Sequence, residues 1–146
     1  MKTMLSTAIM IATQAHDGQF DKGGNPYILH PLAVAGLLQE IDEELQCIAI
    51  LHDTIEDSDV TFLELRYAGL SERIISGITS LTKMKGESYE EYKEKVFANR
   101  DAMIVKMADL THNSDIRRLK GVTEKDIKRL VKYNTFYLEL KDRLYV

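Results

Sequence analysis

The segment from residue 52 to residue 57 reads HDTIED, which places one imidazole and three carboxylates within about a turn and a half of helix. Asp53 and Asp57 are four residues apart, so on a helix they would repel each other. An apolar run at residues 47–51 comes directly before them, and negative charge near the end of such a helix opposes the helix dipole. A bound cation would reverse both penalties. A site that mixes imidazole with carboxylate suits manganese, iron or zinc better than calcium.

Two further segments place a histidine or an acid beside an expected helix. His30 lies in PYILHP, residues 26–31, between a loop and a helix start. Asp109 lies in KMADLTHN, residues 106–113, toward the end of an apolar helix. A single His-Asp pair often occurs by chance, and acids in a loop are often only solvated. The order His30, then His52-Asp53, then Asp109 is what favours a metal site over that interpretation.

Apolar residues recur at helical spacing through most of the chain, which predicts an all-α class. The two prolines, Pro26 and Pro31, lie in one short window, and residues 19–27 around the paired glycines are expected to form a loop. Helices are expected over about residues 5–17, 31–39, 43–51, 61–68, 71–83, 88–97, from 99 or 101 to about 110, and from 123 to near the C-terminus. The last helix is expected to bury a stripe formed by Ile127, Leu130, Val131, Tyr137 and Leu138.

The composition is that of one compact domain, expected to span residues 1–146. With 19 Lys and Arg against 23 Asp and Glu, the net charge is −4. This charge argues against nucleic-acid and membrane partners, but not against a small anionic nucleotide held by local cations. The lone cysteine, Cys47, lies in an apolar run, so a buried thiol and a reducing, cytoplasmic location are expected. No segment resembles a membrane span or a signal peptide, and the oligomeric state stays open.

Four strings in this order resemble a known family: AHDGQ at 15–19, PYILHP at 26–31, HDTIED at 52–57 and VKMAD at 105–109. The histidine and aspartate order resembles the signature of HD-domain metal-dependent phosphohydrolases, and the strings together are similar to the hydrolase domain of RelA/SpoT homologues. The resemblance runs from about residue 4 to about residue 118 and implies an HD-domain bundle of about seven to eight helices. A chain of 146 residues has no room for the synthetase region of bifunctional members. It therefore resembles the stand-alone small alarmone hydrolases of the metazoan SpoT-homologue type.

The resemblance also implies a role for each site residue. It assigns one manganese ion to His30, His52, Asp53 and Asp109. It matches Glu56 and Asp57 to the pair of acids that positions or deprotonates the attacking water. The implied reaction is hydrolysis of guanosine 3′,5′-bis(diphosphate), or of the corresponding pentaphosphate, to GDP or GTP and pyrophosphate.

Several residues are candidates for holding the substrate. They are Lys22, Tyr27, Lys83, Lys106, Asn113 and Arg117, with Lys85 and Arg118 as further candidate cations. Lys106 has a second interpretation as a structural partner of carboxylates, and Arg117 and Arg118 have one as helix caps. Tyr27 is equally consistent with simple packing beside the prolines. His16 is expected to brace the glycine loop and His112 to orient its neighbours.

Two positions depart from the family. Asp21 stands where the family usually has an arginine against the guanine base, and Ile116 stands where several members have a polar residue. Asp21 favours a second hypothesis, an HD phosphohydrolase for another nucleotide such as the 2′-phosphate of NADPH. A third hypothesis is a non-catalytic nucleotide sensor. Glu56 and Asp57 argue against the sensor, because a pure binder needs no water-activating acids.

Overall fold

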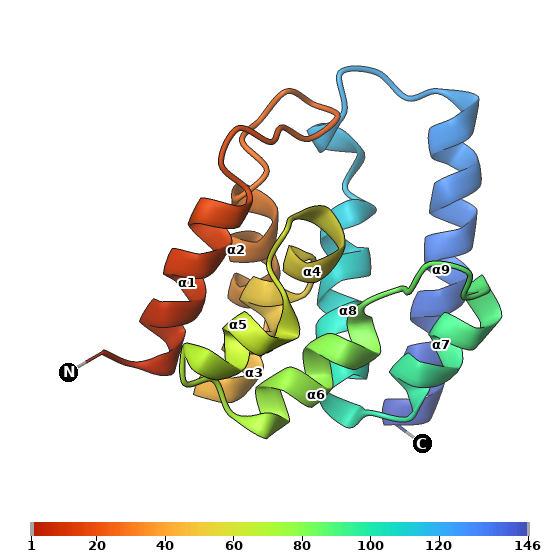
Figure 1. Cartoon of the computed structure of the whole chain (residues 1–146). Helices are drawn as coiled ribbons and strands as arrows, with labels where there is room; N and C mark the ends of the chain where they lie inside the picture. The colour runs from red at the N-terminus through yellow and green to blue at the C-terminus, as the bar shows by residue number, and fades with distance from the viewer. Residues whose placement is uncertain (1, 146) are drawn as a thin grey trace.

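The computed structural model describes residues 2–145, so the two ends of the expected domain, Met1 and Val146, lie outside it. Within that range the chain forms nine α-helices, one short 3-10 helix and a single isolated bridge between Phe20 and Pro26 (Figure 1). The predicted all-α class is confirmed. The helices are α1 (Met4–Ala15), α2 (Leu29–Gly36), α3 (Glu43–Leu51), α4 (Thr54–Asp57), α5 (Phe62–Tyr67), α6 (Glu72–Leu81), α7 (Tyr89–Phe97), α8 (Arg100–Asn113), η1 (Ile116–Arg118) and α9 (Glu124–Leu144).

Most helices begin where a hydroxyl, carboxylate or amide side chain caps them. Ser71 and Ser88 accept hydrogen bonds from backbone N–H groups in the first turns of α6 and α7, as the sequence predicted. Asn99 caps α8, which decides between the two starts considered for that helix. At α9 the capping is reciprocal: Thr123 accepts from the backbone of Asp126, and the Asp126 carboxylate accepts from the backbone of Thr123.

The HDTIED segment does not continue the helix before it. Helix α3 ends at Leu51, and a turn at His52 and Asp53 leads into the separate one-turn helix α4. Asp53 is the N-cap of α4, and Glu56 and Asp57 are the last two residues of this four-residue helix. The acids thus follow the end of α3 on a separate helical turn, and the predicted repulsion between Asp53 and Asp57 agrees with the pKa of Asp57, which burial and the Asp53 charge both raise. The arrangement of the donor atoms gives further support for a metal ion.

Helix α3 lies at the centre of the bundle and contacts α1, α2, α6 and α8 (Figure 1). Residues 47–51 of α3 are all at most 1% exposed, so the second half of this helix is apolar on every side, as an enclosed helical segment must be. Cys47 is buried as predicted. Gly77 lets α6 approach α3 closely, because a Cβ there would lie 2.5 Å from Cδ1 of Ile48. The core thus fixes the end of α3, which carries His52.

The last helix buries a different face from the one predicted. Ile127 and Val131 are more than half exposed, whereas Phe136 and Leu140 are completely buried. The Phe136 ring packs edge-on against rings of α7, including Tyr89 and Phe97. The predicted stripe was wrong at Ile127, Val131 and Leu138, because α9 packs along α8 and the aromatic side of α7, which covers only one side of the helix. Tyr137 of the stripe does pack against the core. None of the helices in residues 2–145 combines the length and the apolar content that crossing a bilayer requires.

An arginine in α6 ties three helix ends together. The guanidinium of Arg73 donates to Asp42 at 2.8 Å, to Asp101 at 2.9 Å and to Glu44 at 3.4 Å. We expect Arg73→Met to lower the free energy of unfolding by about 1 kcal/mol, near the upper end for a partly exposed ion-pair network. The hydrogen bond from Arg73 holds the pKa of Asp42 below its usual value. Its stabilisation is therefore complete above the pKa of the unfolded carboxyl and is lost as the pH falls through the lowered pKa.

Urea unfolding near pH 7 and near pH 3 tests this prediction. The difference between wild type and Arg73→Met should be largest near neutral pH and should shrink in acid. Arg66→Met is the matched control, because Arg66 forms a single, largely exposed pair with Glu72. An equal loss of stability in both variants would contradict the role of the network.

Candidate metal centre and adjoining pocket

Four side chains from three parts of the chain converge at the end of α3. Asp109 Oδ1 lies 2.9 Å from His30 Nε2 and 3.3 Å from His52 Nε2. Asp53 Oδ2 lies 3.1 Å from His52 Nε2 and 3.6 Å from His30 Nε2. The two histidines and Asp109 are buried. Helices α2 and α8 bring His30 and Asp109 to this point, and the turn after α3 supplies the adjacent pair.

In both His30 and His52, the ring nitrogen that faces away from the carboxylates, Nδ1, has a partner that fixes the orientation of the ring. His52 Nδ1 lies 2.6 Å from the carbonyl oxygen of Ala49, which can only accept, so this nitrogen carries the proton. His30 Nδ1 lies 2.8 Å from Nδ1 of His112, and the two rings stack. Burial and the nearby Arg118 lower the pKa of His112 to about 4, so its neutral ring accepts the proton of His30. Both Nε2 atoms are thereby directed to the carboxylates.

The two carboxylates are held by further donors. Asn113 Nδ2 donates to Oδ1 of Asp109 at 2.9 Å, and Lys106 Nζ donates to Oδ2 at 2.8 Å. Tyr27 donates its hydroxyl to Oδ2 of Asp53 at 2.5 Å. Burial opposes a charge on His52, but Asp53 and Asp109 raise its pKa well above the usual value. The electrostatic potential at the cluster is therefore negative, which favours the binding of a cation, either a proton or a metal ion.

Glu56 and Asp57 lie beside this cluster on α4. Burial raises the pKa of the Glu56 carboxyl, and its Oε1 accepts a hydrogen bond from the backbone N–H of Lys83. Burial and the nearby Asp53 carboxylate raise the pKa of Asp57. Both side chains are thus stronger bases than free carboxylates, which suits the acceptance of a proton.

The AHDGQ string braces α4 against the end of α1. The side-chain nitrogen of Gln19 donates to the carbonyl oxygen of Asp57 at 2.7 Å and to that of Ala15 at 3.3 Å. Because a carbonyl oxygen can only accept, these contacts distinguish the amide nitrogen of Gln19 from its amide oxygen. Its amide oxygen lies 2.8 Å from Nδ1 of His16, whose ring is buried. This contact matches the predicted role of His16 in bracing the glycine loop. Through Gln19, the same set of contacts also holds the backbone of Asp57.

A pocket of about 330 Å³ adjoins the cluster. Tyr27 and Asn113 line it, and these same two side chains bond to Asp53 and Asp109. The loop after α1, the η1 segment and α9 form the remaining walls. Figure 1 shows these three segments gathered at one end of the bundle. The pocket has the size of a small-molecule site and opens beside the convergent acids.

Comparison with known families finds one match, to the HD domain, over residues 8–132. The chain belongs to the HD domain family. His30, His52-Asp53 and Asp109, which converge here, are the residues that the sequence resemblance assigned to the histidine and aspartate signature of this family. The similarity to RelA/SpoT hydrolases that the sequence predicted is confirmed, because relatives named as guanosine-3′,5′-bis(diphosphate) 3′-pyrophosphohydrolases match most of the chain.

Curated relatives of this HD domain chain include a guanosine-3′,5′-bis(diphosphate) 3′-pyrophosphohydrolase of Haemophilus influenzae, 35% identical over 92% of the chain. A GTP pyrophosphokinase of Myxococcus xanthus is 34% identical over 97% of the chain. The chain spans only 22% and 20% of the lengths of these two relatives. A solved structure described as a metazoan ortholog of SpoT that hydrolyzes ppGpp superposes with a TM-score of 0.77 at 23% identity. That alignment covers 99% of this chain and 87% of the other, and it shows the fold.

The donor set fits a divalent metal ion. Two ligand atoms that each lie about 2.1 Å from an ion are at most about 4.2 Å apart. The four nitrogen–oxygen distances in the cluster, 2.9 to 3.6 Å, all satisfy this limit. His30, His52 and Asp109 together offer donor atoms that lie within 4.8 Å of one another. Two imidazoles with two carboxylates suit a transition metal ion.

The candidate substrate residues fall into two groups. Lys22, Tyr27, Asn113 and Arg118 line the pocket. The others, Lys85 among them, do not line it: Lys106 pairs with Asp109, Lys83 contributes its backbone N–H to Glu56, and Arg117 pairs with Asp115 and is 87% exposed.

Sequence reasoning missed the contribution of α9 to the pocket. Asp126, Arg129, Leu130 and Tyr133 line it. The only local signal was the capping pattern at Asp126, which marks a helix start rather than a binding site.

Removing the partner of His30 should weaken metal binding without removing a ligand. We expect His112→Leu to lower Mn²⁺ affinity about 10- to 100-fold, because His30 Nδ1–H loses its acceptor. His112→Asn should keep most of the affinity, because its amide oxygen can replace Nδ1 as the acceptor. Isothermal titration with Mn²⁺ measures both variants, and equal affinity for wild type and His112→Leu would contradict the predicted role.

Proposed function

We propose that this chain is a manganese-dependent hydrolase that cleaves guanosine 3′,5′-bis(diphosphate), or the pentaphosphate, to GDP or GTP and pyrophosphate. The observation that carries the proposal is the convergence of His30, His52, Asp53 and Asp109 next to two acids and a nucleotide-sized pocket. The name of the Haemophilus influenzae relative supports the same reaction. We further propose that residues 1–146 act as one hydrolase unit and that the protein works in the cytoplasm, where a free buried thiol such as Cys47 is stable.

In this proposal His30, His52, Asp53 and Asp109 would hold the metal ion. Such an ion, when bound, supplies Lewis-acid polarisation of the phosphoryl oxygens and lowers the pKa of water. Glu56 or Asp57 takes a proton from the attacking water. The water oxygen forms a bond to phosphorus, the bond from phosphorus to the 3′ oxygen breaks, and that oxygen gains a proton in the nucleoside product.

A second candidate substrate, the 2′-phosphate of NADPH, was favoured in the sequence by Asp21. Asp21 pairs with Arg118 from the opposite wall of the pocket. A guanidinium is therefore present in the pocket even though Asp21 replaces the family arginine, and this weakens the argument for NADPH. A non-catalytic sensor is disfavoured by the raised pKa of both Glu56 and Asp57.

Turnover assays with purified protein and Mn²⁺ test these alternatives. The guanosine bis(diphosphate), NADPH and ordinary nucleotides are presented separately, and the products are separated by chromatography. Pyrophosphate released from the guanosine compound by wild type, but not by His52→Ala, supports the proposal. Phosphate released only from NADPH rejects it in favour of the second candidate, and tight nucleotide binding with no turnover rejects it in favour of a sensor.

A further inference from the structure

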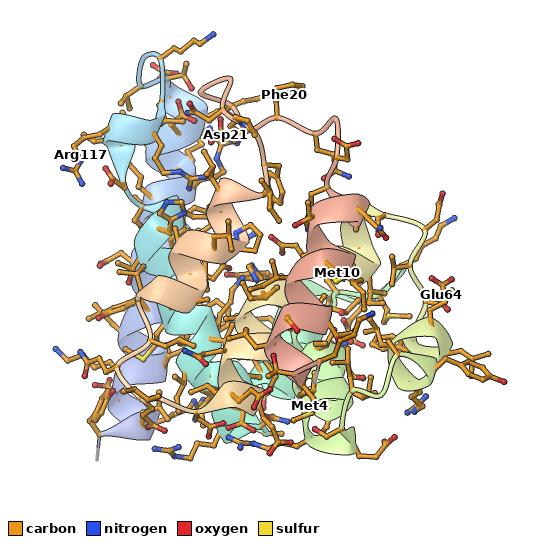
Figure 2. All side chains as sticks on the ribbon, turned by 90° about the vertical axis from the view of Figure 1, so that its left-hand side faces the viewer. Met4, Met10, Phe20, Asp21, Glu64 and Arg117 are labelled. Atoms are coloured by element: carbon orange, nitrogen blue, oxygen red, sulfur yellow. The ribbon has the colours of Figure 1, made fainter. Side chains whose placement is uncertain are left out.

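The pocket contains an ion pair that joins two distant parts of the chain. Arg118 Nη2 lies 3.4 Å from Oδ2 of Asp21, 97 residues away in sequence. The two side chains are only 20% and 13% exposed, whereas the adjacent Arg117 is 87% exposed. Figure 2 shows Asp21 on the loop that faces the η1 segment, while Arg117 projects away from that loop. Arg118 is thus directed into the pocket, and its neighbour is directed to solvent.

Each member of the pair is held in place by other groups. Arg118 Nη1 donates to the carbonyl oxygen of His112 and to Oδ1 of Asn113, both at 3.1 Å. Asp21 Oδ1 accepts from the backbone N–H of Asn25 at 2.9 Å. The two side chains are therefore oriented before any ligand enters, which reduces the entropy lost on binding.

The backbone prevents the two walls from separating freely. A Cβ at Gly23 would lie 2.0 Å from the carbonyl oxygen of Arg118, so the loop and η1 touch at a point that only glycine allows. Gly24 follows with a φ of +85°, a conformation that other residues rarely adopt. The position of Asp21 relative to Arg118 is therefore a property of the fold.

Most charged side chains that line the pocket are paired with one another. Asp21 and Arg118 neutralise each other, and a phosphate beside the Asp21 carboxylate would be repelled. Arg129 also lines the pocket, but it pairs with Asp126, which lines the pocket too. Lys22 is the lining cation outside these two pairs. A phosphate group therefore fits beside Lys22, and an uncharged group with hydrogen-bond donors fits beside the Asp21 carboxylate.

We propose that Asp21 and Arg118 together recognise the edge of a guanine base. This inference rests on the proposed function, since it names the element that selects the nucleotide at the same site. Guanine presents two donors, N1–H and the 2-amino group, beside the O6 acceptor. A carboxylate can accept from both donors while a neighbouring guanidinium donates to O6. Adenine presents one donor and one acceptor on that edge, so part of the pair would stay buried without a partner.

Equilibrium binding separates this inference from the catalytic proposal. Titration of the Mn²⁺-loaded protein with GDP, IDP and ADP needs no turnover, and IDP lacks only the 2-amino group. Wild type should bind GDP about 10-fold more tightly than IDP or ADP. Asp21→Asn and Arg118→Met should each lose about 10-fold in GDP affinity and change ADP affinity less than about 2-fold. Arg66→Met, far from the pocket, is the matched control and should leave all three affinities unchanged.

If the protein hydrolyses the guanosine bis(diphosphate), the kinetics of that reaction provide a second measurement. Asp21→Asn should raise KM about 10-fold and leave kcat within about 2-fold, because the pair contacts the base rather than the reacting phosphorus. Discrimination among GDP, IDP and ADP by a wild type that does not hydrolyse the guanosine compound would reject the proposed function and leave this inference standing. Equal binding of the three nucleotides, binding of none, or equal losses of GDP and ADP affinity in the variants would overturn it.

Discussion

Asp109→Asn is expected to abolish divalent-metal binding and nucleotide hydrolysis. The carboxylate of Asp109 is the centre of the cluster, because its Oδ1 faces both His30 and His52 within 3.3 Å. An amide has the same shape but no charge, and one of its two ends can only donate. Mn²⁺ affinity should therefore fall by more than about 100-fold, beyond the loss expected for a residue that only supports a ligand.

The same change should also destabilise the protein. Lys106 is 17% exposed and donates to Asp109 at 2.8 Å, so Asp109→Asn leaves a mostly buried ammonium group without its carboxylate. Breaking such a pair costs about 3 kcal/mol. The double variant Asp109→Asn/Lys106→Met removes both charges and should recover most of that stability while metal binding stays absent.

Isothermal titration with Mn²⁺ and thermal unfolding measure the two effects separately. Asp142→Asn, on an exposed part of α9, is the matched control and should resemble wild type in both experiments. Near-wild-type Mn²⁺ affinity in Asp109→Asn would show that the cluster is not the metal site. Failure of the double variant to regain stability would assign the loss to something other than the unpaired Lys106.

The four ligand candidates could be predicted from sequence because their signal is local. His52 and Asp53 are adjacent, and His30 and Asp109 each lie in a short string with an expected helix boundary. Helix starts were predictable for the same reason, since a cap such as Ser71 acts within its own first turn. Apolar spacing also gave the number and order of the longer helices. Each of these features depends on residues only a few positions apart.

Features that depend on packing between distant segments were not predictable. Arg117 and Arg118 are adjacent and chemically identical, and only the fold of η1 decides that the second one meets Asp21. The exposed Ile127 and Val131 on α9 look like a core stripe in sequence, but no helix within residues 2–145 covers that side. The break that places Glu56 and Asp57 on a helical turn separate from α3 was likewise not predicted.

The second large effect is expected from Glu56→Gln, which should lower kcat about 100- to 10,000-fold and leave Mn²⁺ affinity almost unchanged. Glutamine keeps an oxygen that can accept the Lys83 N–H, so the local structure should persist. It cannot take a proton from water, because an amide is not a base at neutral pH. The four metal-ligand candidates are untouched, so binding and turnover should separate in this variant.

Asp57→Asn distinguishes which of the two acids accepts the proton. Its carboxylate also has a raised pKa, but its backbone rather than its side chain is held by Gln19. If Glu56 is the base, Asp57→Asn should lower kcat less than Glu56→Gln does, and the order reverses if Asp57 is the base. Glu90→Gln, exposed on α7, is the matched control for a lost carboxylate. Full activity in both Glu56→Gln and Asp57→Asn would exclude α4 as the source of the base, because these are its only two carboxylates.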